Sequence, residues 1–167
     1  MLEVAVLTVL PGAVAFAAAM DLLTMRIPNR ISALMVLAFF PLALLGGLGA
    51  SEMLNHVAAG LLMLVLGVLL FIPGWFGGGD AKLMAAIGLW IGPDNLFPYI
   101  FYVALAGGLI AAAFCSARSV PLPRVLLGEA WAIRLHRHDT GIPYGLALAA
   151  GALLVYPYTV WFTGLAH

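Results

Sequence analysis

Long apolar runs that are almost free of charge restrict the fold of this chain more than any other feature. A membrane-spanning helix needs roughly 20 apolar residues, and five runs reach or approach that length. They are Leu2–Met20, Ile31–Leu48, His56–Ile72, Tyr99–Ala117 and Ile142–Leu165. A soluble domain carries about 25% charged residues, whereas 8% of these 167 residues are charged. The sequence therefore predicts an all-α, polytopic integral membrane protein.

A sixth apolar segment, Ala81–Ile91, is too short to cross a membrane easily. With Asp80 and Gly92 as its ends it gives about 20 Å of helix, against about 30 Å of hydrocarbon. If it does cross, every lysine and arginine falls on one side: Arg26, Arg30, Lys82, Arg118, Arg124, Arg134 and Arg137. Positive residues stay cytoplasmic. We therefore predict six transmembrane helices with both termini on the non-cytoplasmic side. The fourth helix is short, so we expect the membrane around it to be locally thin or the structure beside it to be filled with water.

Composition also excludes several classes of partner and cofactor. The formal net charge is zero, so nothing favours binding to nucleic acid. The single cysteine, Cys115, rules out a disulfide within the chain and any zinc site built on several cysteines. The histidines do not pair at ligand spacing, so we expect neither a metal nor another cofactor.

The rest of the chain offers no second domain. The first apolar run lacks a basic start and is expected to be a span, not a cleaved signal peptide. The polar stretch Ser116–Gly141 is expected to be a cytoplasmic loop with an interfacial helical piece, Trp131 lying at headgroup level. We therefore expect one membrane-embedded domain over residues 1–167.

Two carboxylates stand at span ends on the basic side. Asp21 closes the first span and Asp80 opens the fourth. Both have a purely structural interpretation: Asp80, after three glycines, is a good N-cap, and Asp21, offset by Arg26, marks the end of a span. Ionisable groups at membrane depth are costly, however, and by default suggest function.

The chemistry that such a pair supports is peptide hydrolysis. Two close carboxylates do not easily both ionise, so they share a proton. The ionised group takes a proton from water while the neutral one donates to a carbonyl oxygen, without metal or covalent intermediate. Gly77, Gly78 and Gly79 supply backbone freedom and room for a substrate backbone. The helix N-terminus behind Asp80 favours its ionised form.

Three motifs carry a family resemblance. "GGGDAKL" (Gly77–Leu83) resembles the GxGD motif of the membrane aspartyl proteases, most closely the type IV prepilin peptidases. "DLLTMRIPN" (Asp21–Asn29) looks like the first-aspartate segment of that family, and "IPYGLALAAG" (Ile142–Gly151) looks like the start of its last span. Their order and spacing fit, and the resemblance covers essentially the whole chain.

The resemblance implies a bacterial inner-membrane endopeptidase that removes short, basic leaders from pilin-like precursors at the cytoplasmic membrane face. Asp21 and Asp80 would be the catalytic pair. Seven further residues match motif positions and are candidates for the substrate site: Pro28, Asn29, Gly77, Gly79, Lys82, Pro143 and Tyr144. The role of Lys82 stays open between stabilising the ionised pair, binding a substrate carbonyl, and anchoring at the membrane face.

One difference from the larger family members bears on which reactions we expect. Larger members carry a cytoplasmic insert with zinc-binding cysteine pairs, which is tied to N-methylation of the trimmed pilin. Here Asp21–Ile31 is a tight connection without cysteine. The chain therefore resembles the small, peptidase-only branch that serves Flp or tight-adherence pili. Two other functions fit the residues: a proton- or ion-coupled transporter, and a non-catalytic scaffold for pilus assembly.

Overall fold

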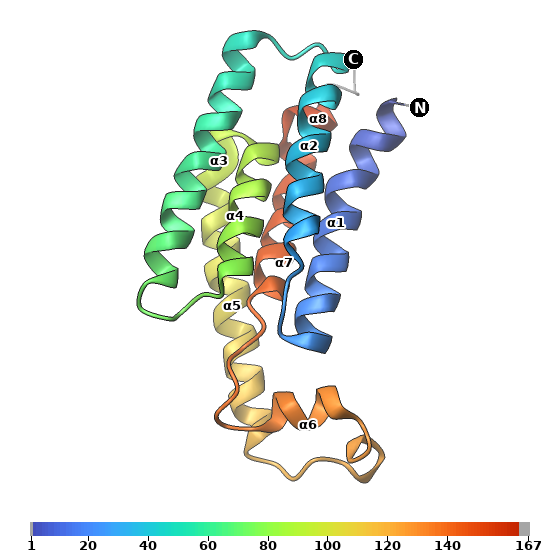
Figure 1. Ribbon diagram of the computed structural model, residues 1–167, viewed down its shortest axis with the longest axis vertical. Helices are drawn as coiled ribbons and strands as arrows, with labels where there is room; N and C mark the ends of the chain where they lie inside the picture. The colour runs from blue at the N-terminus through green and yellow to red at the C-terminus, as the bar shows by residue number, and fades with distance from the viewer. Residues whose placement is uncertain (1, 164–167) are drawn as a thin grey trace.

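The computed structural model describes residues 2–163, and these form a bundle of helices with no β-strand among them (Figure 1). The prediction of an all-α fold is confirmed. The α-helices are α1 Leu2–Thr24, α2 Asn29–Leu45, α3 Ala50–Phe71, α4 Gly78–Ile91, α5 Leu96–Arg118, α6 Ala130–His136, α7 Gly145–Val155 and α8 Val160–Thr163. Short 3-10 turns lie at Pro93–Asn95, Arg124–Leu126 and Tyr156–Tyr158.

Proline and glycine residues mark several of the helix ends. Pro28 precedes α2 and keeps the residue before it out of the helical region. Gly92 ends α4 with φ of 74°, a left-handed conformation that favours glycine. The apolar run Ile142–Leu165 was predicted as one helix, but Tyr156–Tyr158 interrupts it. Pro157, inside that turn, lacks the N–H that a continuing helix requires. Residues 164 and 165 of the predicted span lie outside the described residues.

Three of the described helices are both long and apolar enough to cross a membrane. They span Val4–Thr24, Ala50–Phe71 and Pro93–Arg118. Two other apolar helices, Asn29–Leu45 and Gly145–Tyr158, are shorter. These lengths fit a membrane protein, while the number of crossings stays a prediction.

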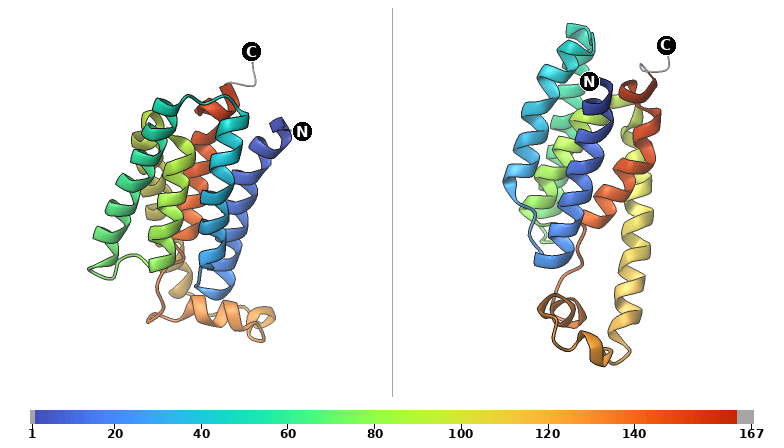
Figure 2. Two further views of the ribbon diagram at one scale, coloured as in Figure 1. Left: turned by 45° about the horizontal axis from the view of Figure 1, so that its top comes forward. Right: turned by 90° about the vertical axis from the view of Figure 1, so that its right-hand side faces the viewer.

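The short helix α4 is the centre of the bundle. It packs against α2, α3 and α7, and most of its residues are buried (Figures 1 and 2). Protein therefore surrounds most of α4. Its length then does not have to match the hydrocarbon thickness, because mismatch is a cost of lipid-facing surface.

Glycines let α3 and α4 approach closely. A Cβ added to Gly88 of α4 would lie 2.5 Å from Met63 Cγ and 3.1 Å from the Ala59 carbonyl oxygen. We expect Gly88→Ala to lower the free energy of unfolding by about 1–3 kcal/mol, because overpacking forces the helices apart. Denaturant unfolding in detergent measures this. Gly12→Ala is the control, because a Cβ there meets nothing within 4 Å. Equal stability of the two variants would contradict the packing argument.

Candidate active site

The two aspartates singled out by the sequence line one cavity. It has a volume of about 280 Å³ and lies where α1 ends and α4 begins. Its lining residues are Asp21, Met25, Arg26, Ile27, Gly77, Gly78, Gly79 and Asp80. The cavity therefore joins the first two motifs, which are separated by most of α2 and α3 in the chain.

Asp21 lies in the last turns of α1 and is held by the start of α7. The side chain is 5% exposed, and the Gly145 N–H donates a hydrogen bond to its Oδ2 at 2.7 Å. A Cβ on Gly145 would lie 2.9 Å from both Cβ and Oδ2 of Asp21. Only glycine at position 145 brings the α7 backbone this close to the carboxylate.

Asp80 lies in the first turn of α4, at the third helical position. The N-cap is Gly77, whose N–H donates to Asp80 Oδ2 at 2.9 Å. Asp80 is therefore not the N-cap residue itself: the helix begins at Gly78, and the carboxylate reaches back to the cap backbone, as the second half of a capping box does. The other oxygen, Oδ1, is buried and accepts no hydrogen bond within residues 2–163.

The connection between α1 and α2 brings the two aspartate segments together. Its first residue, Met25, has φ of 55°, which turns the chain sharply after α1. Ile27 then packs on Gly79, where an added Cβ would lie 3.1 Å from both Ile27 Cβ and its carbonyl oxygen. Gly79 is thus a point of close contact between the two motifs, in addition to preceding Asp80.

The geometry is suited to a pair of carboxylates with divided roles. Asp21 and Asp80 interact electrostatically, and each is fixed through one oxygen by one backbone N–H. Two carboxylates that line one cavity oppose each other's ionisation, so such a pair can share one proton. One member can then act as base and the other as acid.

Lys82 does not line this cavity. Its Nζ donates to Asn29 Oδ1 at 3.1 Å, which brings two of the candidate residues together. Successive helical residues are turned by about 100°, so Lys82 and Asp80 point to nearly opposite faces of α4. Pro28, the N-cap residue of α2, lies directly before Asn29.

The last motif lies at the start of α7, and its residues Pro143 and Tyr144 do not line the cavity. Pro143 is buried and Tyr144 is half-buried just before the helix begins. The Tyr144 ring packs against Phe76 at 5.1 Å between centroids, directly beside Gly77. Aromatic contact therefore joins the segments that supply the hydrogen-bond donors to Asp21 and Asp80.

A short helix, α6, braces this end of the bundle, and it confirms the expected helical piece in the polar stretch (Figures 1 and 2). Arg134 donates to the Leu23 carbonyl oxygen at 2.9 Å, two residues beyond Asp21. Arg118, at the end of α5, donates to the Leu135 carbonyl oxygen at 2.8 Å. These contacts tie α6 to the ends of both α1 and α5.

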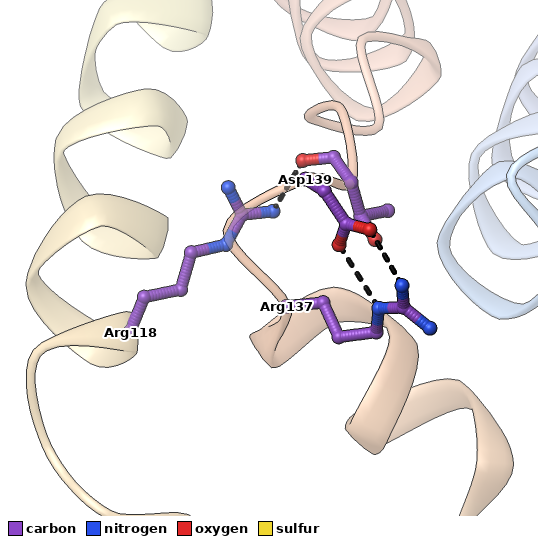
Figure 3. Close-up of polar contacts among 4 residues, drawn as sticks. Arg118, Arg137 and Asp139 are labelled. Carbon is purple, nitrogen blue, oxygen red and sulfur yellow. Dashed lines mark hydrogen bonds and ion pairs between the residues drawn. The ribbon is translucent and has the colours of Figure 1, made fainter.

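Arg118 also holds the segment that leads to Gly145. Its Nη2 donates to the carbonyl oxygens of Thr140 and Gly141, each at 3.0 Å. Beside it, Arg137 forms an ion pair with Asp139 (Figure 3). The hydrogen bonds from Arg137 hold the pKa of Asp139 below its ordinary value. Arg118, Arg134 and Gly145 are not among the residues predicted for the site, because carbonyl acceptors and backbone donors leave no signature in side-chain patterns.

We expect Arg118→Gln to loosen the connection to α7. Two peptide carbonyls, at Thr140 and Gly141, would lose a charged donor, and such hydrogen bonds contribute about 1.5–3 kcal/mol each. Hydrogen–deuterium exchange over residues 137–145 should accelerate about tenfold or more, with little change in α3. Arg124→Gln, at an exposed position in the same loop, is the matched control. Unchanged exchange in the Arg118 variant would contradict a bracing role.

Comparison with known proteins identifies the family of this chain. A family model described as the type IV leader peptidase family matches residues 8–112, which include both aspartates. The prepilin leader peptidase/N-methyltransferase of Bacillus subtilis (strain 168) is 36% identical over 144 residues, or 83% of this chain and 49% of the relative. The chain thus spans about half the length of that curated relative. No solved structure matches significantly. The chain therefore belongs to the type IV leader peptidase family.

Proposed function

We propose that this protein is an aspartyl endopeptidase that cleaves the short basic leader from pilin-like precursors. One observation carries the proposal: Asp21 and Asp80 line the same cavity, each anchored through Oδ2 by a backbone N–H. With one oxygen of each carboxylate fixed, the other can hold or transfer a proton. The membership of the family and the prepilin peptidase relative support the choice of substrate.

In the proposed reaction the ionised carboxylate takes a proton from water as the water attacks the scissile carbonyl carbon. The protonated carboxylate donates to the carbonyl oxygen, which gives a tetrahedral diol. Transfer of a proton to the leaving amine then breaks the C–N bond and releases the leader with a new carboxylate. Burial of both side chains strengthens their electrostatic action on the substrate.

The proposed location is the bacterial inner membrane, with the site at its cytoplasmic face. The start of α1 and the helix α8 lie at the end of the bundle opposite α6 (Figures 1 and 2). This arrangement supports an even number of crossings, six in our proposal, with both termini outside. The basic residues stand at the α6 end, in agreement with a cytoplasmic orientation. One domain over residues 1–167 would carry the activity.

We further propose that this protein does not methylate its product. The relative from Bacillus subtilis is named as both a leader peptidase and an N-methyltransferase. In this chain α1 and α2 are joined by the short connection Met25–Pro28, with no cysteine pair. The small, peptidase-only branch of the Flp type is the better fit.

The proposal is tested with the purified protein, a pilin-type precursor and mass spectrometry. In H₂¹⁸O we expect the released leader to gain one ¹⁸O in its new carboxylate, because water is the nucleophile. Hydroxylamine should trap no acyl-enzyme, EDTA should leave the rate unchanged, and S-adenosylmethionine should add no methyl group. No cleavage of any pilin-type precursor would contradict the proposed function, and a trapped acyl-enzyme would contradict the mechanism.

A further inference from the structure

An apolar groove of about 640 Å³ runs along the bundle on the other side of α4. One face of α2, one of α3 and one of α4 line it. The lining residues are Asn29, Ser32, Ala33, Val36, Leu37 and Phe40 from α2, Val57, Gly60, Leu61 and Leu64 from α3, and Lys82, Ala85, Ala86 and Leu89 from α4. The volume is in the range of pockets that bind small ligands, roughly 300–1,000 Å³.

All the polar residues of this groove gather at one end. Asn29 and Ser32 lie in the first turns of α2 and Lys82 lies in the first turns of α4, so they share the end of the bundle that holds the aspartates. None of the groove's lining residues within the described part of the chain is acidic. The remaining length, towards Phe40 and Leu89, is apolar.

The polar end is a set of hydrogen-bond donors with capacity to spare. Lys82 uses one donor on Asn29 Oδ1 and has two more N–H bonds. The Asn29 amide offers its own N–H groups. Ser32 is 6% exposed, and its Oγ has no partner among the described residues. That Oγ is fully buried, so the donors open to a ligand in the groove are those of Lys82 and Asn29, which are both exposed.

We propose that this groove binds an anionic phospholipid of the cytoplasmic leaflet. The phosphate accepts hydrogen bonds from Lys82 and Asn29, and an acyl chain fills the apolar length between α2 and α3. Lysine is a common phosphate ligand, and anionic headgroups are attracted to basic residues at the cytoplasmic surface. A free phosphate would leave the apolar length unfilled, whereas a phospholipid satisfies both ends.

The lipid site is separate from the aspartate cavity. Lys82 and Asp80 point to nearly opposite faces of α4, and the two sets of lining residues have no member in common. The lipid assignment therefore goes beyond the proposed peptidase activity and does not depend on it. It also gives Lys82 and Asn29 a role that the catalytic pair does not require.

Native mass spectrometry of the delipidated full chain tests the proposal, with phosphatidylglycerol and phosphatidylcholine of identical acyl chains as probes. We expect phosphatidylglycerol to be retained more tightly. Lys82→Gln should weaken its binding roughly fivefold and leave phosphatidylcholine unchanged. Ala33→Phe, at an exposed position lining the groove, should weaken both lipids by filling the space.

Two control variants distinguish binding in the groove from a general effect of removing a positive charge or enlarging a side chain. Arg30→Gln removes an exposed cation next to Asn29 that does not line the groove, and Leu34→Phe enlarges an outward-facing residue beside Ala33. Neither should change lipid binding. Equal retention of the two lipids, equal losses for Lys82→Gln and Arg30→Gln, or displacement of the lipid by the apolar helix of a pilin precursor would each overturn the assignment. Because the readout is lipid binding, its failure leaves the peptidase proposal intact.

Discussion

Asp80→Asn is expected to abolish leader cleavage, with a loss of about 10²–10⁴-fold in kcat, and Asp21→Asn should have the same effect. Asparagine matches aspartate in shape but neither takes nor gives a proton at neutral pH. Its amide oxygen can still accept the hydrogen bond from Gly77 or Gly145. Initial rates of precursor cleavage by the purified variants measure the loss.

The same variants distinguish a catalytic role of Asp80 from a role in helix capping alone. If Asp80 served only the capping box with Gly77, Asp80→Asn would retain activity and Asp80→Ala would lose about 0.5–2 kcal/mol of stability. In the proposed mechanism both variants are inactive and only the alanine variant is less stable. The double asparagine variant should be no slower than either single variant, because the two groups act as a unit. Asp94→Asn, at an exposed site beyond Gly92, is the control. Full cleavage by either single asparagine variant would refute the two-carboxylate mechanism.

Much of the fold could be predicted from the apolar runs and from the glycines and polar residues between them. Helices over the four long runs between Leu2 and Ala117 follow because consecutive apolar residues in lipid must satisfy their backbone groups within the helix. Gly92 ends α4 where the sequence predicts it, whereas α2 begins at Asn29, two residues before the predicted start of its span. The burial of α4 could not be predicted, because lipid-facing and protein-facing positions of a membrane protein are equally apolar. The interruption of the last helix at Pro157 was not predicted, because the apolar run continues through this proline.

The candidate site could also be predicted only in part. Asp21 and Asp80 stood out because a carboxylate at the end of an apolar run is rare and costly. Lys82 was grouped with them because it matches a motif position of the family, yet helical geometry turns it to the groove on the far side of α4. Gly145 contributes through its backbone N–H and its missing Cβ, and neither has a side-chain signature. Motif resemblance locates such residues without indicating which face of a helix they serve.

Gly145→Ala is expected to lower kcat by about 10²-fold while both aspartates remain in place. The added Cβ would lie 2.9 Å from Asp21 Oδ2, so either the carboxylate or the start of α7 must shift. A displacement of about 1 Å in a catalytic group can cost that much in rate. Gly141→Ala, in the same connection, is the control, because its Cβ would meet only Met25 Cε at 3.8 Å.

Two measurements distinguish a positioning role of Gly145 from a general loss of fold. If the alanine acts through Asp21, combining Gly145→Ala with Asp21→Asn should reduce cleavage no further than Asp21→Asn alone. If it acts by unfolding the protein, the losses should multiply and the unfolding midpoint should fall in proportion to the lost rate. Substrate affinity should change little in the single variant, because the displaced group takes part in the reaction and not in holding the leader. A rate equal to that of Gly141→Ala would show that the contact between α7 and Asp21 is not needed for cleavage.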